Sequence, residues 1–157
     1  MGLDMYLTKK TYVKVWEHMK PEERFAVSIK KGGKIFSAIK PERVSYIIEE
    51  VGYWRKANQI HNWFVENVQD GKDECQESYV SRKQLQQLLD LCNKVLSAKE
   101  QAVTVGAEVL PTKSGFFFGS TEYDSYYLDD LSDTKKILEG VLSGPEGEGD
   151  FYYRASW

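Results

Sequence analysis

The segment at residues 52–65 carries most of the side chains in this sequence that could bind a small molecule or react with it. Arg55 presents a rigid fork of N–H donors, which suits a phosphate or a carboxylate. The amides of Asn58 and Asn62 can both donate and accept, as recognition of a ribose or a base edge requires. His61 can donate, accept or titrate near neutral pH. These residue types predict a polar site for an anionic, nucleotide-like ligand.

Two tryptophans, Trp54 and Trp63, lie in the same segment and could stack on the ring of a ligand. The polar side chains also fit a second interpretation, in which they form a buried structural network. Arg55 would then pair with an acidic side chain of the protein instead of a ligand. The candidate partners are Asp4, Asp124 and Asp129. The sequence leaves both interpretations open.

A second candidate site is the loop at residues 113–124, in which two glycines bracket three phenylalanines. Main-chain N–H groups near Gly119 and Ser120, at the expected start of a helix, would attract an anion, and Lys113 could add positive charge. The spacing does not match a Walker A motif. A tyrosine or an aspartate of the following helix could face the same cavity, from the set Tyr123, Tyr126, Tyr127, Asp129 and Asp130. The alternative is an aromatic segment that packs into the core, followed by an amphipathic helix with a solvated acidic side.

The sequence lacks the motifs of well-known catalytic and metal sites. It has no GxSxG, HxH or HExxH pattern, and Cys75 and Cys92 form neither a CxxC pair nor a cluster with histidine. We therefore expect no metal and no cofactor. An enzyme would have to use His61 as its acid or base, with Arg55 stabilising negative charge. The cysteine usage and the lack of a signal-peptide pattern predict a cytoplasmic protein.

Charge and aromatic content restrict the classes of partner. The formal net charge is −3 and the isoelectric point is about 5.5, whereas binding to a nucleic-acid polymer requires a basic surface. No apolar stretch is long enough to span a bilayer, so we expect no membrane partner. Aromatic residues make up 13% of the chain, which could fill a core or form the interface of a homo-oligomer.

Three segments have the residue pattern of strands and are expected to form one antiparallel sheet. Residues 3–7 alternate between apolar and more polar side chains, as in a strand with one buried face. Two apolar runs flank Gly32-Gly33, a pair that favours a hairpin turn because glycine readily adopts positive φ. Residues 150–157 are rich in aromatic side chains, which favour a strand.

Three helices, near residues 41–68, 81–98 and 121–142, complete a single α+β domain over residues 1–157. The first would begin at Pro41 and bury a stripe of side chains with three- and four-residue spacing. This stripe would comprise Val44, Ile47, Ile48, Val51 and Trp54, and would continue as Arg55, Asn58 and Asn62.

The starts of the other two helices have capping signals. Ser81 and Gln84 have the spacing of a capping box, in which each side chain bonds the main chain of the other residue. Ser120 or Thr121 would cap the third helix.

Four blocks of the sequence resemble a family of small phage and prophage proteins. The blocks are MGLDMYL at residues 1–7, VGYWRKAN at 51–58, IHNWF at 60–64 and GFFFG at 115–119. Members of that family commonly begin with the same MGLDMYL string. The resemblance implies a phage origin and no particular reaction.

Small phage proteins with a polar, aromatic pocket and no catalytic signature include anti-defence sponges, which sequester nucleotide immune signals of the host. By this analogy we expect a binder of a small nucleotide-derived ligand. The residues predicted to bind it are Trp54, Arg55, Asn58, His61, Asn62, Lys113, Gly119, Ser120 and Tyr126. The alternatives are an enzyme that modifies such a nucleotide through His61, and a protein-interaction inhibitor of a host factor.

Overall fold

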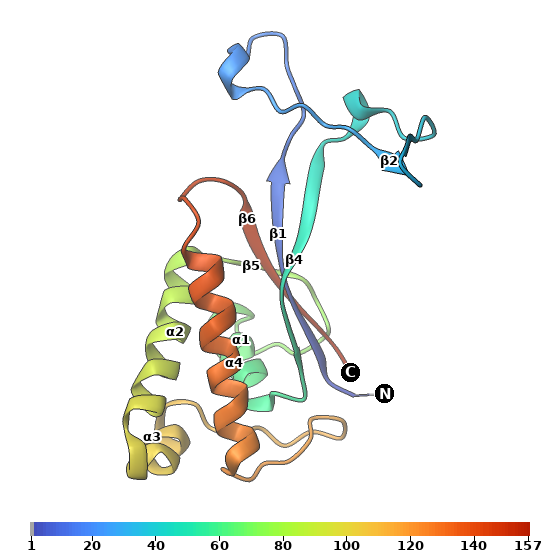
Figure 1. The fold of residues 1–157 in the computed structure, drawn as a ribbon. Helices are drawn as coiled ribbons and strands as arrows, with labels where there is room; N and C mark the ends of the chain where they lie inside the picture. Colours follow the sequence, from blue (N-terminus) through green and yellow to red (C-terminus); the bar gives the residue numbers. More distant parts are fainter. Residues whose placement is uncertain (1) are drawn as a thin grey trace.

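The structure, a computed structural model, describes residues 2–157, so Met1 of the first sequence block lies outside it. Its centre is an antiparallel sheet with the strand order β4-β1-β6-β5 (Figure 1). The strands are β1 (Asp4–Tyr12), β4 (Tyr46–Arg55), β5 (Ser78–Val80) and β6 (Asp150–Ser156). The helices α1 (Asn58–Val68), α2 (Arg82–Ser97), α3 (Ala102–Val109) and α4 (Ser125–Leu142) lie to one side of the sheet. The expected α+β class is therefore confirmed.

The hydrophobic core lies between the sheet and the helices. Alternate residues of the central strands face it, as the strand periodicity predicts. In these two strands the buried residues are Met5 and Leu7 on β1, and Phe151, Tyr153 and Ala155 on β6. α2 packs against α4 on the outer side of this core. The predicted strands at residues 3–7 and 150–157 are thus confirmed, and they pair with each other.

The predicted helix at residues 41–68 is wrong over its first half. A short 3₁₀ helix at Pro41–Arg43 is followed by the strand β4, and α1 begins only at Asn58. β4 pairs with β1 along its length, and its β-branched and aromatic residues favour an extended backbone. Ile47 and Ile48 are exposed instead of buried. The proposed continuous helical stripe from these residues into α1 therefore does not exist.

The Gly32-Gly33 turn forms as predicted, but its hairpin does not join the main sheet. β2 (Lys30–Lys31) pairs with β3 (Lys34–Ile35) in a separate two-stranded sheet. Both glycines have positive φ, 59° and 78°, as the turn requires. The expected single sheet is wrong because the hairpin lies in a segment that projects beyond the main sheet (Figure 1).

Residues 13–45, which we call the arm, project from the remainder of the chain, which we call the body (residues 2–12 and 46–157). The paired ends of β1 and β4 carry the arm beyond the helices (Figure 1). Besides β2 and β3, the arm contains 3₁₀ helices at Pro21–Glu23 and Pro41–Arg43. Val13 is the one buried residue in the arm. The arm therefore has no core of its own.

The helix starts confirm one capping prediction and correct another. At the start of α2, Ser81 and Gln84 form the predicted capping box. At the start of α4, the carboxylate of Asp124 accepts from the N–H of Tyr127 at 3.1 Å. Ser120 and Thr121 do not cap α4, because the chain stays non-helical until Ser125.

Two elements of the body were not predicted from the sequence: the short strand β5, and the helix α3, which follows a 3₁₀ helix at Lys99–Gln101. Within residues 2–157, no helix combines the length and the apolar character needed to cross a membrane.

Candidate functional site

The two segments that the sequence singles out meet at the start of α1. Asn58 is 1% exposed, and its amide N–H₂ group donates to the carbonyls of Phe118 at 3.0 Å and Ser120 at 2.7 Å. Its amide oxygen accepts from the main-chain N–H of Lys113 at 2.9 Å. Asn58 therefore ties residues 113–120 to α1. For this residue the geometry matches the structural-network interpretation.

A pocket of about 290 Å³ lies beside this junction, and we call it the Arg55 pocket. Its walls come from the end of β4, the first turn of α1, the loop before α4 and the first turns of α4. Its lining residues are Arg55, Lys56, Gln59, Thr112, Gly119, Ser120, Glu122, Asp124, Tyr126, Tyr127 and Asp130. Four of the predicted ligand residues, Arg55, Gly119, Ser120 and Tyr126, are thereby brought together.

Two cationic side chains form one wall of the Arg55 pocket. The side chain of Arg55 is 60% exposed, and its Nε lies 3.9 Å from a carboxylate oxygen of Asp4. Of the three candidate partners, Asp4 is thus the one that Arg55 approaches, although a pair this long and exposed contributes less than about 1 kcal/mol. Lys56 lines the same wall. The guanidinium is held only loosely by Asp4, so it can turn toward a ligand.

The backbone at this wall is tightly packed. Lys56 has a φ of 59°, a region that non-glycine residues seldom occupy, and Gly119 has a φ of 85°. A Cβ atom added to Gly119 would lie 3.1 Å from the Cβ of Lys56. The N–H of Lys56 donates to the carbonyl of Leu3 at 2.8 Å. These constraints fix where the Lys56 side chain leaves the backbone.

The pocket lining also includes a second group, a hydrogen-bonded amide and carboxyl pair. The buried amide of Gln59 donates to Asp130 at 3.0 Å and to the carbonyl of Tyr127 at 3.4 Å. Burial raises the pKa of Asp130 from 3.8 to about 6, and the neighbouring acids Asp133, Asp129 and Asp124 add to this rise. The hydrogen bond from Gln59 opposes it. Near pH 6, Asp130 can therefore both accept and donate hydrogen bonds.

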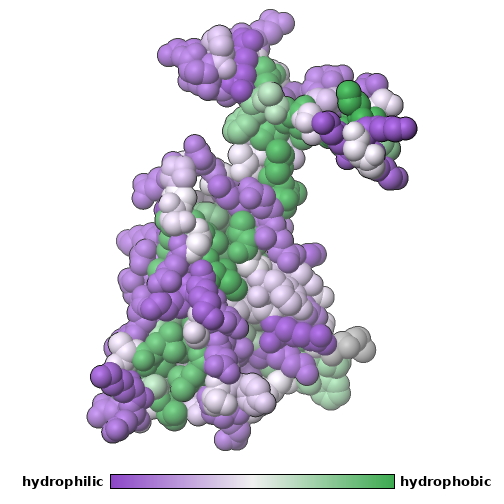
Figure 2. All heavy atoms as spheres, viewed as in Figure 1, coloured by the Kyte–Doolittle hydropathy of each residue, from purple (hydrophilic) through white to green (hydrophobic). Residues whose placement is uncertain are grey.

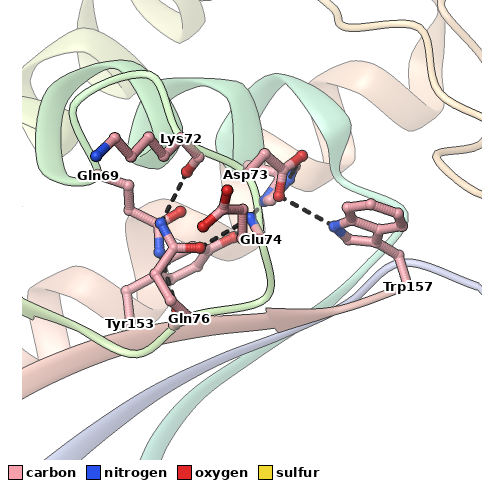
Figure 3. A network of polar contacts seen from close by, with 8 residues as sticks. Gln69, Lys72, Asp73, Glu74, Gln76, Tyr153 and Trp157 are labelled. Atoms are coloured by element: carbon pink, nitrogen blue, oxygen red, sulfur yellow. Dashed lines mark hydrogen bonds and ion pairs between the residues drawn. The ribbon is translucent and has the colours of Figure 1, made fainter.

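His61 belongs to a different network, on the side of α1 that faces β6. It is 1% exposed, and its Nδ1 and Nε2 lie 2.7 Å from the hydroxyl of Tyr153 and 2.9 Å from a carboxylate oxygen of Asp73. The other oxygen of Asp73 accepts from the indole N–H of Trp157 at 3.0 Å (Figure 3). Both ring nitrogens are thus engaged inside the protein, and His61 does not line the Arg55 pocket.

The loop that supplies Asp73 is itself held by amide side chains (Figure 3). The amide of Gln69 donates to the carbonyl of Gln76 at 3.0 Å, and the amide of Gln76 donates to the carbonyl of Lys72 at 2.8 Å. Burial raises the pKa of Tyr153 well above its ordinary value, so its hydroxyl stays protonated at neutral pH. This network joins the 69–76 loop to α1 and β6.

Three other predicted ligand residues also lie apart from the Arg55 pocket. Trp54 is buried, and its indole N–H donates to the hydroxyl of Thr134 at 2.8 Å. Asn62 lines a separate hollow of about 190 Å³. Lys113 is not among the lining residues of the Arg55 pocket. Its main-chain N–H donates to the side chain of Asn58 instead.

Sequence reasoning missed Lys56 and Gln59. Lys56 and Gln59 directly flank residues that were singled out, so the basic pair Arg55-Lys56 was a usable signal. Asp130 was among the helix residues expected to face a cavity, but its contact with Gln59 was not predicted, because only the packing of α4 beside α1 creates it.

The fold and the pocket define an α+β protein with a helix-covered antiparallel sheet and a small pocket of mixed charge. No family model, no curated protein and no solved structure matches the chain. Among residues 2–157, no group of three or more histidine, cysteine, aspartate or glutamate side chains is placed to hold a metal ion.

Proposed function

We propose that the protein binds a small, anionic, nucleotide-like molecule in the Arg55 pocket. The observation that carries this proposal is the division of the pocket into a cationic wall, Arg55 and Lys56, and a hydrogen-bonding wall, Gln59 and Asp130. A volume of about 290 Å³ is near the lower end of ligand pockets. A mononucleotide-sized group has the matching polarity, with phosphate at one end and a base that carries hydrogen-bonding groups at the other.

Each wall has a role in this proposal. Arg55 and Lys56 contact the phosphate, with the guanidinium leaving its long contact to Asp4 for a charge-assisted bond. The carboxyl of Asp130, held by Gln59, accepts from an amino group of the base. Tyr126, 77% exposed, offers a ring on which the base stacks.

The same proposal assigns the protein to sequestration of a host immune nucleotide by a phage. Its supports are the resemblance to phage proteins and the meeting of two of the resembling blocks, VGYWRKAN and GFFFG, at the pocket. The lining residues of the pocket include no histidine and no cysteine. Binding without turnover is the form of the function that we propose.

Calorimetry against a panel of cyclic dinucleotides and ADP-ribose derivatives tests this function. We expect heat of binding from at least one compound, and recovery of that compound intact after the protein is denatured. Arg55→Ala should weaken binding about tenfold or more, because a hydrogen bond to a charged group contributes about 1.5–3 kcal/mol. Lys94→Ala, which changes an exposed lysine on α2 outside the pocket, is the matched control.

Two results would contradict the proposal. One is the absence of heat and of any thermal shift across the whole panel. The other is binding that Arg55→Ala and Lys94→Ala weaken equally, since it would then depend on overall charge and not on the pocket. A ligand recovered in altered form would instead favour the enzyme alternative.

A further inference from the structure

The arm exposes apolar side chains that a monomer in water leaves without a partner. Phe25 is 50% exposed and Ile35 is 83% exposed, and both lie outside any core. Figure 2 shows hydrophobic residues gathered where the arm joins the body. The other exposed apolar side chains of the arm and of the strands that carry it are Tyr12, Val15, Trp16, Ile39, Tyr46, Ile47 and Ile48. A surface of this kind marks an interaction site.

The arm also contains a surface hollow that suits an apolar group. A hollow of about 180 Å³ opens on its surface, and most of its lining is aliphatic or aromatic. Val15, Phe25 and Val27 form part of that lining. The hollow lies on the projecting segment and not against the body, so an occupant must come from outside this segment.

The arm lacks the internal contacts that would stabilise it alone. Ordering a chain of about thirty residues costs about 1–2 kcal/mol per residue, and Val13 is its one buried residue. The remaining contacts are exposed and local. They include main-chain hydrogen bonds such as Phe36 to Ile29 at 3.0 Å, the bonds from Arg24 to the carbonyls of Met19 and Glu17, and cation–π contacts such as Lys31 on Phe36. Contact with a partner would supply the missing burial.

The net charges of the arm and the body indicate which surface the arm contacts. The arm contains eight lysines and arginines and four glutamates, a net charge of +4, so the body carries −7 of the total of −3. Two arms packed on each other would bring like charges together, whereas an arm on a body joins opposite charges. The arm projects away from its own body (Figure 1), so the acidic body that it contacts would be that of another copy.

We propose that the protein forms a dimer in which the arm of each copy lies on the acidic body of the other. A reciprocal exchange of this kind uses both arms and closes with twofold symmetry, so it does not continue into a filament. The apolar side chains of the arm supply the affinity of the contact, and its lysines supply the orientation.

Sedimentation velocity of the full chain, over a wide range of concentration, tests the dimer. We expect the wild-type protein to sediment as a dimer, and Phe25→Ser combined with Ile35→Ser to sediment as a monomer with unchanged circular dichroism. Both residues lie outside the core, so the variant should fold. Phe116→Ser is the control, because Phe116 is 94% exposed in the body loop before α4, and this variant should remain dimeric.

Charge reversal and crosslinking test which surfaces meet. Replacing Lys30, Lys31 and Lys34 with glutamate should also give a monomer, and sodium chloride should weaken the wild-type dimer because it screens the contact. A carbodiimide, which joins amines to carboxylates, should link these lysines to acidic residues of the body. Mixing normal and heavy-nitrogen-labelled protein identifies the links that join two copies.

Three outcomes would overturn the inference. The first is a wild-type protein that stays monomeric at every concentration, which would leave the arm to a partner of another kind, such as a host protein. The second is a dimer that survives the arm substitutions. The third is a set of intermolecular links confined to one arm and the other arm. None of these outcomes bears on ligand binding in the Arg55 pocket.

Discussion

Large apolar side chains are buried in the core of the body but exposed to solvent in the arm. In the body, Phe64 is fully buried, and its ring stacks on Tyr153 with centroids 3.9 Å apart. In the arm, Phe25 is half exposed and belongs to no core. The difference shows that the stability of a single copy resides in the body. The arm contributes surface, and its conformation is specified by turns and by the paired ends of β1 and β4.

The largest expected effect comes from the same truncation in the two regions. Phe64→Ala should lower the free energy of unfolding by about 3–5 kcal/mol, because it leaves a cavity in the core. Phe25→Ala should change it by less than about 0.5 kcal/mol, as exposed positions do. Urea unfolding at a protein concentration that favours single copies measures both. Equal losses in the two variants would show that the arm unfolds together with the body.

Glycine substitutions extend the comparison to the backbone. Gly52→Ala should cost about 1–3 kcal/mol, because its Cβ would lie 2.9 Å from Ile137 of α4. In the arm, a Cβ at Gly33 meets nothing within 4 Å, and only its φ of 78° opposes it. Gly33→Ala should therefore leave the urea midpoint of the body unchanged. Combining Gly52→Ala with Ile137→Ala should cost less than the two changes added together.

The network around His61 allows a matched pair of substitutions on one strand. Tyr153→Phe removes the hydroxyl bonded to His61 and leaves a buried nitrogen without a partner, so we expect a loss of about 1–3 kcal/mol. Tyr152→Phe changes the neighbouring residue, which points to the other face of the sheet, and should cost less than about 0.5 kcal/mol. Thermal unfolding compares the two. Equal losses in the two variants would contradict this assignment, because the hydroxyl of Tyr153 would then add nothing to stability.

The last comparison concerns the pH dependence of stability. The pKa of Asp130 is about 6 in the folded protein and 3.8 ordinarily, so between these values the folded state binds more protons than the unfolded state. Stability from this group therefore falls as the pH rises from about 4 to about 6. Asp130→Asn should remove this part of the slope. Urea midpoints measured across the range would contradict the assignment if the wild type and the variant ran parallel.

Several features could be predicted because local chemistry decides them. The alternation in residues 3–7 and the Ser81 capping box needed no distant information. The Gly32-Gly33 turn likewise follows from the two glycines themselves, because glycine readily adopts the positive φ that the turn requires. The strand β4 could not be distinguished from a helix in this way. Its state depends on pairing with β1, which is more than thirty residues away in the sequence, and that pairing overrides the helical spacing of its apolar residues.

The candidate site shows the same difference between features that one residue decides and features that depend on distant contacts. Arg55 was predicted because its side chain alone suggests anion binding, and it does line the pocket. The use of Asn58 as a tie between α1 and the 113–120 loop depends on a contact that only the folded chain makes. The pairing of Gln59 with Asp130 depends in the same way on the packing of α1 beside α4.

The position of β6 sets the order in which the sheet can be completed during synthesis. β6 lies between β1 and β5, and within residues 2–157 β5 pairs with no other strand. β5 therefore cannot join the sheet until residues 150–156 have left the ribosome, well after the strands on both sides of them. Until then, the edge of β1 that pairs with β6 is free, and the apolar faces of the helices lack part of the sheet that covers them. Contacts this distant in sequence close slowly, so the nascent chain must stay soluble with its core open.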